Sequence, residues 1–190
     1  MTLSSVLLAP EDACELEVRG AVPAAVLVPL YERGGELRVV LTERHHDLPR
    51  HAGEISFPGG RREPEDADLS VTALREAHEE IGLPPERVKL IGALPPSPTM
   101  ATGYAIYPFV GMIDPDQTFV ADPREVADVI DLSLGEIAAG YQRRRLSRRG
   151  MPVRTDAYVA GDHVIWGATA RILADLLDRI GHSTDAPVKR

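Results

Sequence analysis

Three glutamates are the residues of this sequence whose spacing is best suited to chemistry. Glu76, Glu79 and Glu80 stand at i, i+3 and i+4, so a helix would place them on one face. Carboxylates this close repel each other and destabilise a lone helix by roughly a few tenths of a kcal/mol per pair. A divalent cation such as Mg²⁺ would reverse that effect, because it prefers oxygen ligands. The alternative is a solvated acidic helix face, the common origin of such charge runs.

The residues around the glutamates favour metal binding. Arg75 lies one helical turn before Glu79 and can reach its carboxylate, and Gly82 follows the glutamates. The resulting pattern, R-E-x-x-E-E-x-G, is expected by chance on the order of 10⁻⁴ times in a chain of this length. The pair Gly59-Gly60 before the helix predicts a turn with a backbone geometry that glycine adopts freely.

Positive charge is concentrated before the glutamates, although the chain has 21 Lys and Arg against 29 Asp and Glu and a net charge of −8. The cluster consists of Arg44, His45, His46, Arg50, His51, Arg61 and Arg62. Guanidinium groups form paired hydrogen bonds with phosphate, so we favour an anion-binding cluster over a solvated loop. The net negative charge argues against nucleic acids and membrane surfaces as general partners.

The hydrophobic pattern predicts the elements that position these residues. Strands are predicted over residues 24–30, 37–42, 55–57, 88–94, 105–113 and 126–130, with one or two more over 153–164. Helices are predicted over residues 132–139 and 168–180, and over the glutamate segment from an N-cap at Asp68 or Ser70 to Gly82. Pro108 predicts that its strand lies at a sheet edge or a bulge. Strands with segregated helices indicate an α+β fold or an α/β/α sandwich around a mixed sheet.

Length and composition limit the remaining possibilities. The 190 residues are 44% hydrophobic and 26% charged, which is ordinary for one globular domain. We expect residues 1–20 to form an N-terminal lead-in, residues 21–182 the domain and residues 183–190 a frayed tail. The only cysteine, Cys14, excludes an intramolecular disulfide. Because no apolar run could cross a bilayer and no signal-peptide pattern is present, we expect a cytoplasmic protein.

The glutamate segment resembles the Nudix box, whose pattern is G-x5-E-x7-R-E-U-x-E-E-x-G-U, where U is a bulky aliphatic residue. The match is full from Arg75 to Leu83, except that Ala77 stands at a U position. Upstream, counting from Gly60, the acidic residue is Asp66, and Arg75 lies one residue later than the pattern requires. The role of Asp66 is therefore open at this point.

A second group of residues is similar to the signature of the coenzyme A pyrophosphatase branch of Nudix hydrolases. These residues are Leu41-Thr42-Glu43-Arg44, Leu48, His51, Gly53 and Phe57-Pro58-Gly59-Gly60. The box of that branch has an Asp at the upstream position and the same additional residue before the Arg. Looser similarity includes Gly103-Tyr104, Glu125-Val126 and Ile165-Trp166-Gly167, so that the resemblance covers about residues 22–181.

This resemblance implies that Mg²⁺ or Mn²⁺ assists hydrolysis of the diphosphate of coenzyme A or its thioesters, giving 3′,5′-ADP and 4′-phosphopantetheine or its acyl form. It implies metal ligation by Glu76 and Glu80 together with Glu79. Arg75 is then a catalytic-site residue, and Glu79 or Glu125 takes the proton of the attacking water. The substrate-binding residues implied are Arg44, His51, Arg61, Gly59 and Gly60, with Arg44 and Arg61 the first candidates for pairing with the ribose phosphate.

Alternatives remain open for the function and for two segments. The substrate could be another nucleotide, such as ADP-ribose, a dinucleoside polyphosphate or a nucleoside triphosphate. A non-catalytic nucleotide-sensing module is disfavoured by the intact arginine and glutamates, because sensors can lose these acids. Trp166 could be a core residue or stack on adenine, and we favour the core. The arginines at 143–145 and 148–149 could form a solvated arm or bind polynucleotide, and we favour the arm. A homodimer is left open.

Overall fold

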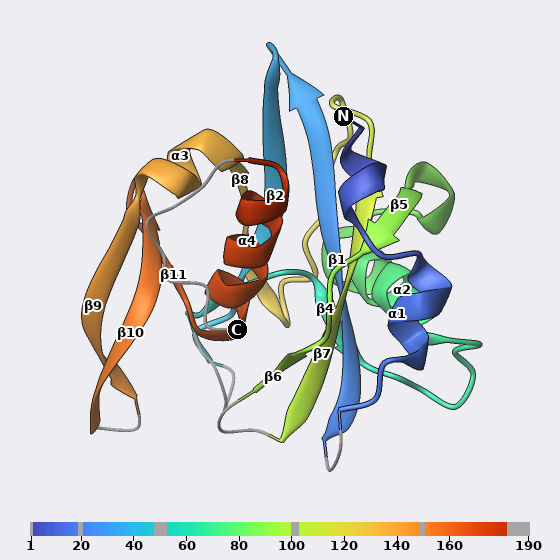
Figure 1. Cartoon of the computed structure of the whole chain (residues 1–190), viewed down its shortest axis with the longest axis horizontal. Coiled ribbons are helices and arrows are strands. Elements are labelled where there is room, and N and C mark those ends of the chain that lie inside the picture. The colour runs from blue at the N-terminus through green and yellow to red at the C-terminus, as the bar shows by residue number, and fades with distance from the viewer. Residues whose placement is uncertain (1, 19–20, 48–52, 100–102, 149–150, 182–190) are drawn as a thin grey trace.

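Two β-sheets and four α-helices are present in the computed structural model, which describes residues 2–18, 21–47, 53–99, 103–148 and 151–181 (Figure 1). The main sheet contains β1 (Val22–Arg33), β2 (Glu36–Arg44), β3 (Ile55–Ser56), β4 (Gly59–Arg61), β5 (Lys89–Ala93), β6 (Ser97–Pro98), β7 (Tyr104–Met112) and β8 (Val126–Ser133). The second sheet contains β9 (Tyr141–Arg148), β10 (Met151–Ala160) and β11 (His163–Trp166). The helices are α1 (Pro10–Glu15), α2 (Leu69–Ile81), α3 (Leu134–Ala139) and α4 (Gly167–Arg179), with short 3₁₀ turns η1 (Leu3–Val6) and η2 (Pro85–Arg87).

Strand β1 is the centre of the main sheet, and one of its edges is shared by two strands. Its other edge pairs in parallel with β7, so the sheet is mixed. On the shared edge, residues 30–33 pair with β2 and residues 24–26 pair with β4. Farther along, β2 leaves β1 and pairs with β3 at Thr42 and Glu43. The segment from β3 to β4 therefore fills the opening between β1 and β2, which places the Gly59-Gly60 pair inside the sheet.

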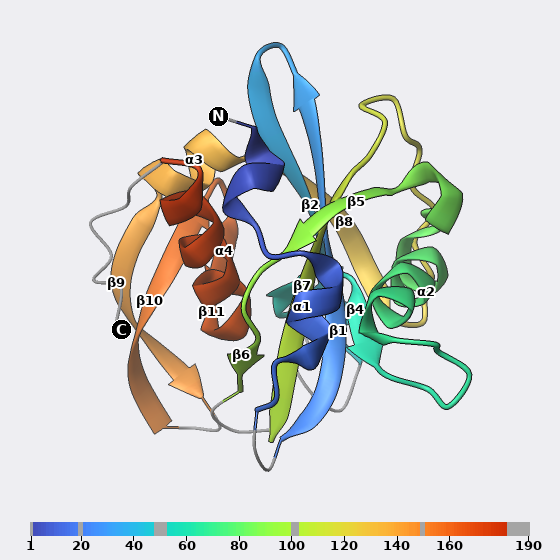
Figure 2. The ribbon, with the colours of Figure 1, turned by 45° about the vertical axis from the view of Figure 1, so that its right-hand side comes forward.

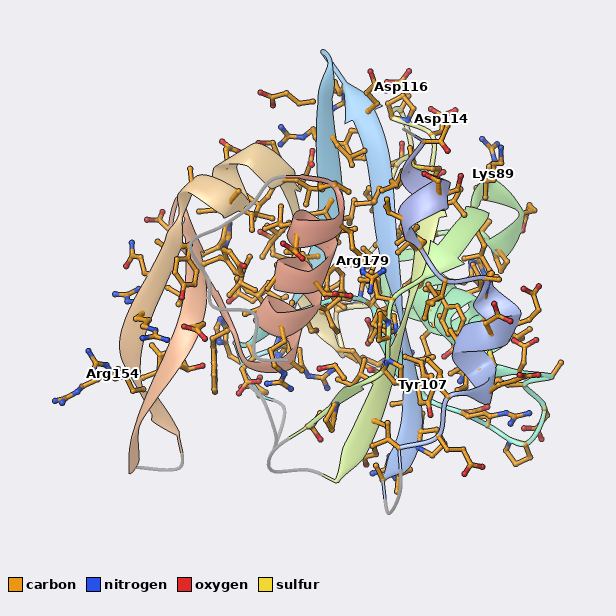
Figure 3. All side chains as sticks on the ribbon, viewed as in Figure 1. Lys89, Tyr107, Asp114, Asp116, Arg154 and Arg179 are labelled. Carbon is orange, nitrogen blue, oxygen red and sulfur yellow. The ribbon has the colours of Figure 1, made fainter. Side chains whose placement is uncertain are left out.

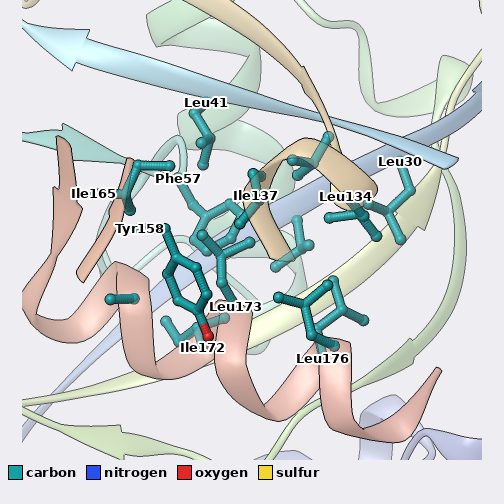
Figure 4. Packing of buried hydrophobic residues seen from close by; sticks show 14 of the residues in the cluster. Leu30, Leu41, Phe57, Leu134, Ile137, Tyr158, Ile165, Ile172, Leu173 and Leu176 are labelled. Atoms are coloured by element: carbon teal, nitrogen blue, oxygen red, sulfur yellow. The ribbon is translucent and has the colours of Figure 1, made fainter. Parts of the chain in front are cut away.

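Both faces of the main sheet are buried, because β1 contributes alternate side chains to two hydrophobic cores. Val26, Val28 and Leu30 pack toward α3, α4 and the second sheet. Figure 4 shows this core, where side chains from α4 converge with Tyr158 from β10 and Phe57 from the main sheet. The intervening residues of β1 pack in the other core, toward α1 and α2, on the opposite side of the sheet (Figure 2). This arrangement confirms the predicted α/β/α sandwich.

The N-terminal segment, expected to be a surface lead-in, packs onto the domain. Ala13 of α1 is fully buried, and Leu8 forms a β-bridge with Ala93 of β5. Two side chains labelled in Figure 3 bind its backbone: the Tyr107 hydroxyl donates to the Leu16 carbonyl at 2.5 Å, and Arg179 Nη1 donates to the Val6 carbonyl at 2.8 Å. Residues 3–16 therefore help to cover the edge of the sheet next to β5.

Most predicted elements are present. The helix that carries the glutamates is α2, and the region 153–164 contains parts of β10 and β11. Strand β9 was not predicted, because the arginines at 143–145 obscure any hydrophobic alternation, and its pairing with β10 defines it. The tail at 183–190 lies outside the described residues. Within the described chain, no helix is long and apolar enough to cross a membrane.

Of the two positions predicted for the Pro108 strand, a sheet edge is wrong, because β7 lies between β1 and β5. An irregularity is present nearby, because the pairing of β5 with β7 shifts register between Leu90 and Gly92. Pro108 lacks an N–H group, but its carbonyl accepts a hydrogen bond from the Leu94 N–H at 2.9 Å. Leu94 lies just after β5, in the break between β5 and β6. The missing donor of the proline therefore faces a gap in the neighbouring strand, where no regular partner requires it.

The close pairing of β4 with β1 leads to a stability prediction for Gly59→Ala. The added Cβ would lie 2.3 Å from the Ala25 carbonyl oxygen and 2.6 Å from the Val26 Cα, and neither backbone atom can move aside alone. We expect the free energy of unfolding in urea to fall by at least about 1–3 kcal/mol. Gly135→Ala is the control, because the nearest atom, Ser133 Oγ, is 3.7 Å away. A loss of equal size in both variants would contradict this explanation.

Candidate active site

Helix α2 carries the glutamates, and both of its ends are fixed by capping residues. The Asp68 side chain accepts hydrogen bonds from the N–H groups of Ser70 and Val71 at 2.8 and 3.1 Å, so Asp68 is the N-cap. At the other end, Gly82 has a φ of 64° and its N–H donates to the carbonyls of Ala77 and His78. The glutamates therefore occupy the last two turns, beside the strand β4.

Asp66 is a buried carboxylate that holds Arg75. Arg75 Nε donates to Oδ1 at 3.0 Å and Nη2 donates to Oδ2 at 3.1 Å. The Thr72 hydroxyl and the Glu63 N–H each donate to Oδ2 at 2.9 Å. The bonds from Arg75 are the largest cause that lowers the pKa of Asp66, to about 2, although burial opposes them. The structure thereby answers the question left by the sequence: Asp66 anchors the arginine of the box.

Arg75 in turn links the loop before α2 to the glutamates. Its Nη1 lies 3.0 Å from Glu76 Oε1 and 3.0 Å from Glu79 Oε2, and its Nη2 donates to the Arg61 carbonyl at 3.0 Å. One guanidinium therefore contacts three carboxylates and one carbonyl. The interaction with Asp66 and Glu76 raises the pKa of Arg75 above its ordinary value, so its positive charge is permanent.

The two glycines of β4 let the glutamates approach the sheet. A Cβ at Gly60 would lie 2.3 Å from Glu76 Oε1, so the carboxylate occupies the space that a side chain would need. The Gly59 N–H donates to Glu80 Oε2 at 3.3 Å. Neither glycine has a positive φ, so the prediction of a glycine-only backbone geometry is wrong here. The pair is required by close packing instead.

Glu80 is a carboxylate buried next to a second carboxylate. It is 5% exposed, and burial, together with repulsion from Glu76, raises its pKa to about 8. Burial also raises the pKa of Glu76. Arg44 Nη1 is 4.0 Å from Glu80 Oε1 and offsets this only in part. The two carboxylates therefore form an electrostatically strained pair that a cation would relieve.

The other two acidic candidates lie at the margin of this pair. The Glu79 carboxylate is bound to Arg75, and its side chain is 58% exposed. Glu125 is exposed just before β8, yet its charge contributes to the raised pKa of both Glu76 and Glu80, so it faces the same site. Its carbonyl accepts a hydrogen bond from the His45 N–H at 2.8 Å, which holds the loop against the end of β2.

A cavity of about 380 Å³ opens beside the glutamates. It is lined by Gly59 and Gly60 of β4, by Arg44 and Arg61, and by the residues that begin α4. Arg44 Nε is buried and has no hydrogen-bond partner among the residues that the structure describes. The Arg61 guanidinium lies 4.9 Å from the centre of the Tyr104 ring, a cation–π contact at the cavity wall. The structure therefore brings four of the five implied substrate-binding residues to one cavity.

The rest of the positive cluster has other roles or lies elsewhere. His51, the fifth substrate-binding candidate, lies outside the described residues, as does Arg50. Arg62 donates to the carbonyls of Asp66 and Ala67, at 3.0 and 2.7 Å, and so braces the loop before α2. His46 is 3.4 Å from Glu43. Among the described members of the cluster, Arg44 and Arg61 are therefore the two that line the cavity.

Trp166 is half-buried between two cavities. It lines the 380 Å³ cavity and also a second cavity of about 430 Å³, which includes Arg144, His163 and Glu43. The described lining of neither cavity includes a glutamate of α2. The smaller cavity is lined by Arg44 and Gly59, which both contact Glu80, so we place the chemistry there. The position of Trp166 differs from the favoured core role, because the residue is only partly buried and lines both cavities.

Comparison with known proteins identifies the family. A model of the NUDIX domain matches residues 21–149. The chain is a Nudix family member. An uncharacterized Nudix hydrolase NudL of Enterobacter sp. is 40% identical over 160 residues, 83% of this chain and 82% of that protein. An uncharacterized Nudix hydrolase NudL of Photorhabdus laumondii is 36% identical over 159 residues, 83% of this chain and 84% of that protein. As a Nudix hydrolase, the protein acts on pyrophosphate bonds.

Solved structures of Nudix proteins share the fold. A MutT/nudix family protein from Enterococcus faecalis has a TM-score of 0.58 at 17% identity, covering 87% of this chain and 64% of that one. The Nudix hydrolase RenU from M. smegmatis has a TM-score of 0.51 at 21% identity, covering 70% of this chain and 81% of that one. At these identities the similarity concerns the architecture only.

Nudix hydrolases generally need divalent metals, and the strained carboxylate pair fits such an ion. Glu76 and Glu80 supply hard oxygen ligands whose mutual repulsion a cation would remove. Across the described residues, however, no three His, Cys, Asp or Glu side chains converge into a complete metal cage. Glu79, the third predicted ligand, is held by Arg75. A metal here would need further oxygens from water and substrate, which is the coordination that Mg²⁺ prefers.

Two features of this Nudix site were missed by sequence reasoning. Tyr104 supports Arg61, and the first turn of α4 forms one wall of the cavity through Gly167, Ala168 and Thr169. These residues follow Gly103 and Trp166 in the segments of looser similarity. That looser similarity was the one sequence signal that could have pointed to these residues, but their types alone did not suggest a chemical role.

The Asp66–Arg75 pair leads to a prediction on stability and pH. A pKa lowered from 3.8 to about 2 means that ionised Asp66 stabilises the fold by about 2 kcal/mol above pH 4. That contribution disappears as the pH falls from about 4 through 2, because the folded state must then take up the proton. We expect Asp66→Asn to lower the free energy of unfolding by about 2 kcal/mol at pH 7, in urea titrations.

The same comparison near pH 2.5 should show a smaller difference between the wild type and Asp66→Asn. Asp116→Asn is a suitable control, because the Asp116 side chain is 93% exposed. A difference between wild type and Asp66→Asn that stays constant from pH 7 to pH 2.5 would contradict the assignment.

Proposed function

We propose that the protein hydrolyses the diphosphate of coenzyme A or acyl-coenzyme A, with Mg²⁺ or Mn²⁺, to 3′,5′-ADP and (acyl-)4′-phosphopantetheine. The observation that carries this proposal is the position of Arg44. Arg44 belongs to the segment that resembles the coenzyme A branch, lies 4.0 Å from Glu80, and lines the cavity with a buried, unpartnered Nε. A guanidinium with free donors beside the metal carboxylates suits one phosphate of a diphosphate.

The residues of this site have distinct proposed roles. Glu76 and Glu80 would hold the metal, whose positive charge would neutralise the diphosphate and lower the pKa of a bound water. Arg75 orients Glu76 and Glu79 through the contacts described above. Glu79, one turn away and exposed, is a carboxylate that can accept the proton of the water, and Glu125 is the second candidate for this role.

The cavity also favours a substrate that extends beyond the diphosphate. Its volume of about 380 Å³ lies within the range of small-molecule sites. Ile55, Phe57 and Ile106 supply apolar walls, and Arg61 supplies a second guanidinium. A nucleoside or pantetheine half of the substrate can therefore be enclosed next to the reacting phosphates.

Hydrolysis of ADP-ribose, a dinucleoside polyphosphate or a nucleoside triphosphate is the alternative within the family, and product mass analysis on a substrate panel separates these from coenzyme A. A sensing module would not need the strained pair of Glu76 and Glu80, which disfavours it.

We also propose a cytoplasmic location, because a chain whose only cysteine is Cys14 suits a reducing compartment. The homodimer stays a prediction.

Removing either metal ligand should lower the rate. Glu76→Gln and Glu80→Gln keep the size of the side chain but remove the charge, so we expect each to reduce kcat by about 10²-fold or more at saturating Mg²⁺. Glu86→Gln, on the exposed turn η2, is the matched control and should leave kcat unchanged. Full activity of the wild type in excess EDTA would overturn the metal requirement.

Replacing the proposed base tests the division of labour between the glutamates. Glu79→Gln should lower kcat by about 10²- to 10⁴-fold with little change in substrate affinity, the range for a positioned acid–base group. Metal affinity, measured by Mn²⁺ titration, should change less than in Glu80→Gln. If Glu79→Gln loses less than tenfold, the base is Glu125, and Glu125→Gln should show the larger loss.

A further inference from the structure

The N-terminus of α4 presents unpaired hydrogen-bond donors to the 380 Å³ cavity. The first N–H groups of a helix have no acceptor within it. The N-cap residue, Trp166, makes no side-chain hydrogen bond that would satisfy them. Gly167, Ala168 and Thr169 line the cavity, and within the described chain their N–H groups donate to no backbone carbonyl of another element. Figure 1 shows that α4 follows directly from β11.

A buried side chain in the same turn also points to a ligand. Thr169 is 8% exposed and lines the cavity, and its hydroxyl has no hydrogen-bond partner in the part of the chain that the structure describes. The hydroxyl oxygen itself is not closed off from solvent, so it can bond to a ligand in the cavity. Arg44, another residue of the cavity lining, has a buried Nε that finds no hydrogen-bond partner among the described residues. Two unpartnered donors of different chemistry therefore belong to the lining of one cavity.

The charge around this space is positive. Arg171 lines the cavity and is fixed by its bonds to the Pro98 carbonyl at 2.7 Å and the Ser97 hydroxyl at 3.2 Å. Together with Arg44 and Arg61 it gives three guanidinium groups, against Glu54 as the acidic residue among the described lining residues. The dipole of the 13-residue helix α4 adds partial positive charge at the same end.

We propose that the first turn of α4 binds a second phosphate group of the substrate, remote from the diphosphate that is cleaved. The inference rests on the proposed function, under which this group is the 3′-phosphate of coenzyme A. The diphosphate must lie at Glu76 and Glu80, which contact Gly60 and Gly59 on the β4 wall of the cavity. The α4 wall of the same cavity is then left for another anion, and Thr169 with the N–H groups of Gly167 and Ala168 supplies its donors.

This assignment changes the expected roles of the arginines. Arg44 lies beside Glu80 and is needed at the diphosphate, and Arg61 is held over the Tyr104 ring. The first candidates for the ribose phosphate, Arg44 and Arg61, are therefore joined by a backbone site that no charged-residue pattern reveals. Gly167 has a φ of 70°, and a Cβ at this position would meet no other atom within 4 Å, so the space beside the start of the helix is open.

The binding test compares 3′,5′-ADP with AMP, which differ only in the 3′-phosphate. Calorimetry on the full chain without metal should show at least about tenfold tighter binding of 3′,5′-ADP. Ala168→Asp places a negative charge at the helix N-terminus, which stabilises the helix but repels phosphate. We expect this variant to lose the preference while its melting temperature is unchanged or higher. A merely structural role of Ala168 would instead lower the melting temperature and weaken both ligands.

Thr169→Val removes the hydroxyl with little change in shape and should reduce the preference about three- to tenfold. Thr155→Val, whose hydroxyl bonds to the neighbouring Asp156 carbonyl away from the cavity, is the matched control and should keep the full preference. Equal affinity of the wild type for 3′,5′-ADP and AMP overturns the inference, as does an equal weakening of both ligands by Ala168→Asp.

Turnover separates this inference from the proposed function. If coenzyme A is cleaved at least about tenfold more efficiently than dephospho-coenzyme A, and Ala168→Asp removes that difference in kcat/KM, both stand. If the two substrates are cleaved equally, the proposed function stands and the phosphate site is wrong. If neither is cleaved but Ala168→Asp still abolishes selective binding of 3′,5′-ADP, the phosphate site stands and the proposed function fails. An equal loss on both substrates in Ala168→Asp would assign the helix to the cleaved diphosphate, which also overturns the inference.

Discussion

The buried ion pair between Asp66 and Arg75 is the interaction on which the site depends. Arg75 must carry a fixed charge next to Glu76 and Glu79, and a free guanidinium on a surface helix would not stay in one orientation. Asp66, with two bonds from Arg75 and one each from Thr72 and a backbone N–H, fixes it. A carboxylate with a pKa of about 2 remains charged in any ordinary solution, so the anchor does not titrate with the chemistry.

The site places Asp66, whose hydrogen-bonding capacity is well used, near a pair of glutamates, Glu76 and Glu80, that have few donors around them. Both carboxylate oxygens of Asp66 accept hydrogen bonds. Glu80, in contrast, has one backbone donor at 3.3 Å and a guanidinium at 4.0 Å. The same functional group, a carboxylate buried to a similar degree, thus has its pKa lowered in Asp66 and raised to about 8 in Glu80. The difference lies in the donors that the surroundings provide. Missing donors around a carboxylate pair are what a bound cation would replace.

Local pattern was enough to predict the helix, its glutamates and most of the strands, because periodicity and caps are encoded within a few residues. Asp68 and Gly82 bound α2 as their types suggest. Long-range pairing was not predictable in the same way. Nothing local in the Gly59-Gly60 pair shows that β4 pairs with β1, and Pro108 is tolerated in a central strand because β5 and β6 are interrupted opposite it. The role of Asp66 was likewise not predictable from local pattern, because it is set by contact with Arg75 in another part of the chain.

The α4 wall shows why a binding site can escape a reading of residue types. Arginines and glutamates can be recognised in the sequence as charged residues. Every helix has unpaired N–H groups at its start, however, and whether they bind a ligand depends on what they face in the fold. Here, within the described chain, the helix start directly after Trp166, the absence of a capping side chain and the unpartnered hydroxyl of the buried residue Thr169 coincide at one cavity. Because β4 presents its glycines to the glutamates on another wall, the same cavity can hold two anions apart. A substrate with two phosphate positions matches that division, whereas one with a lone diphosphate would leave the α4 donors unused.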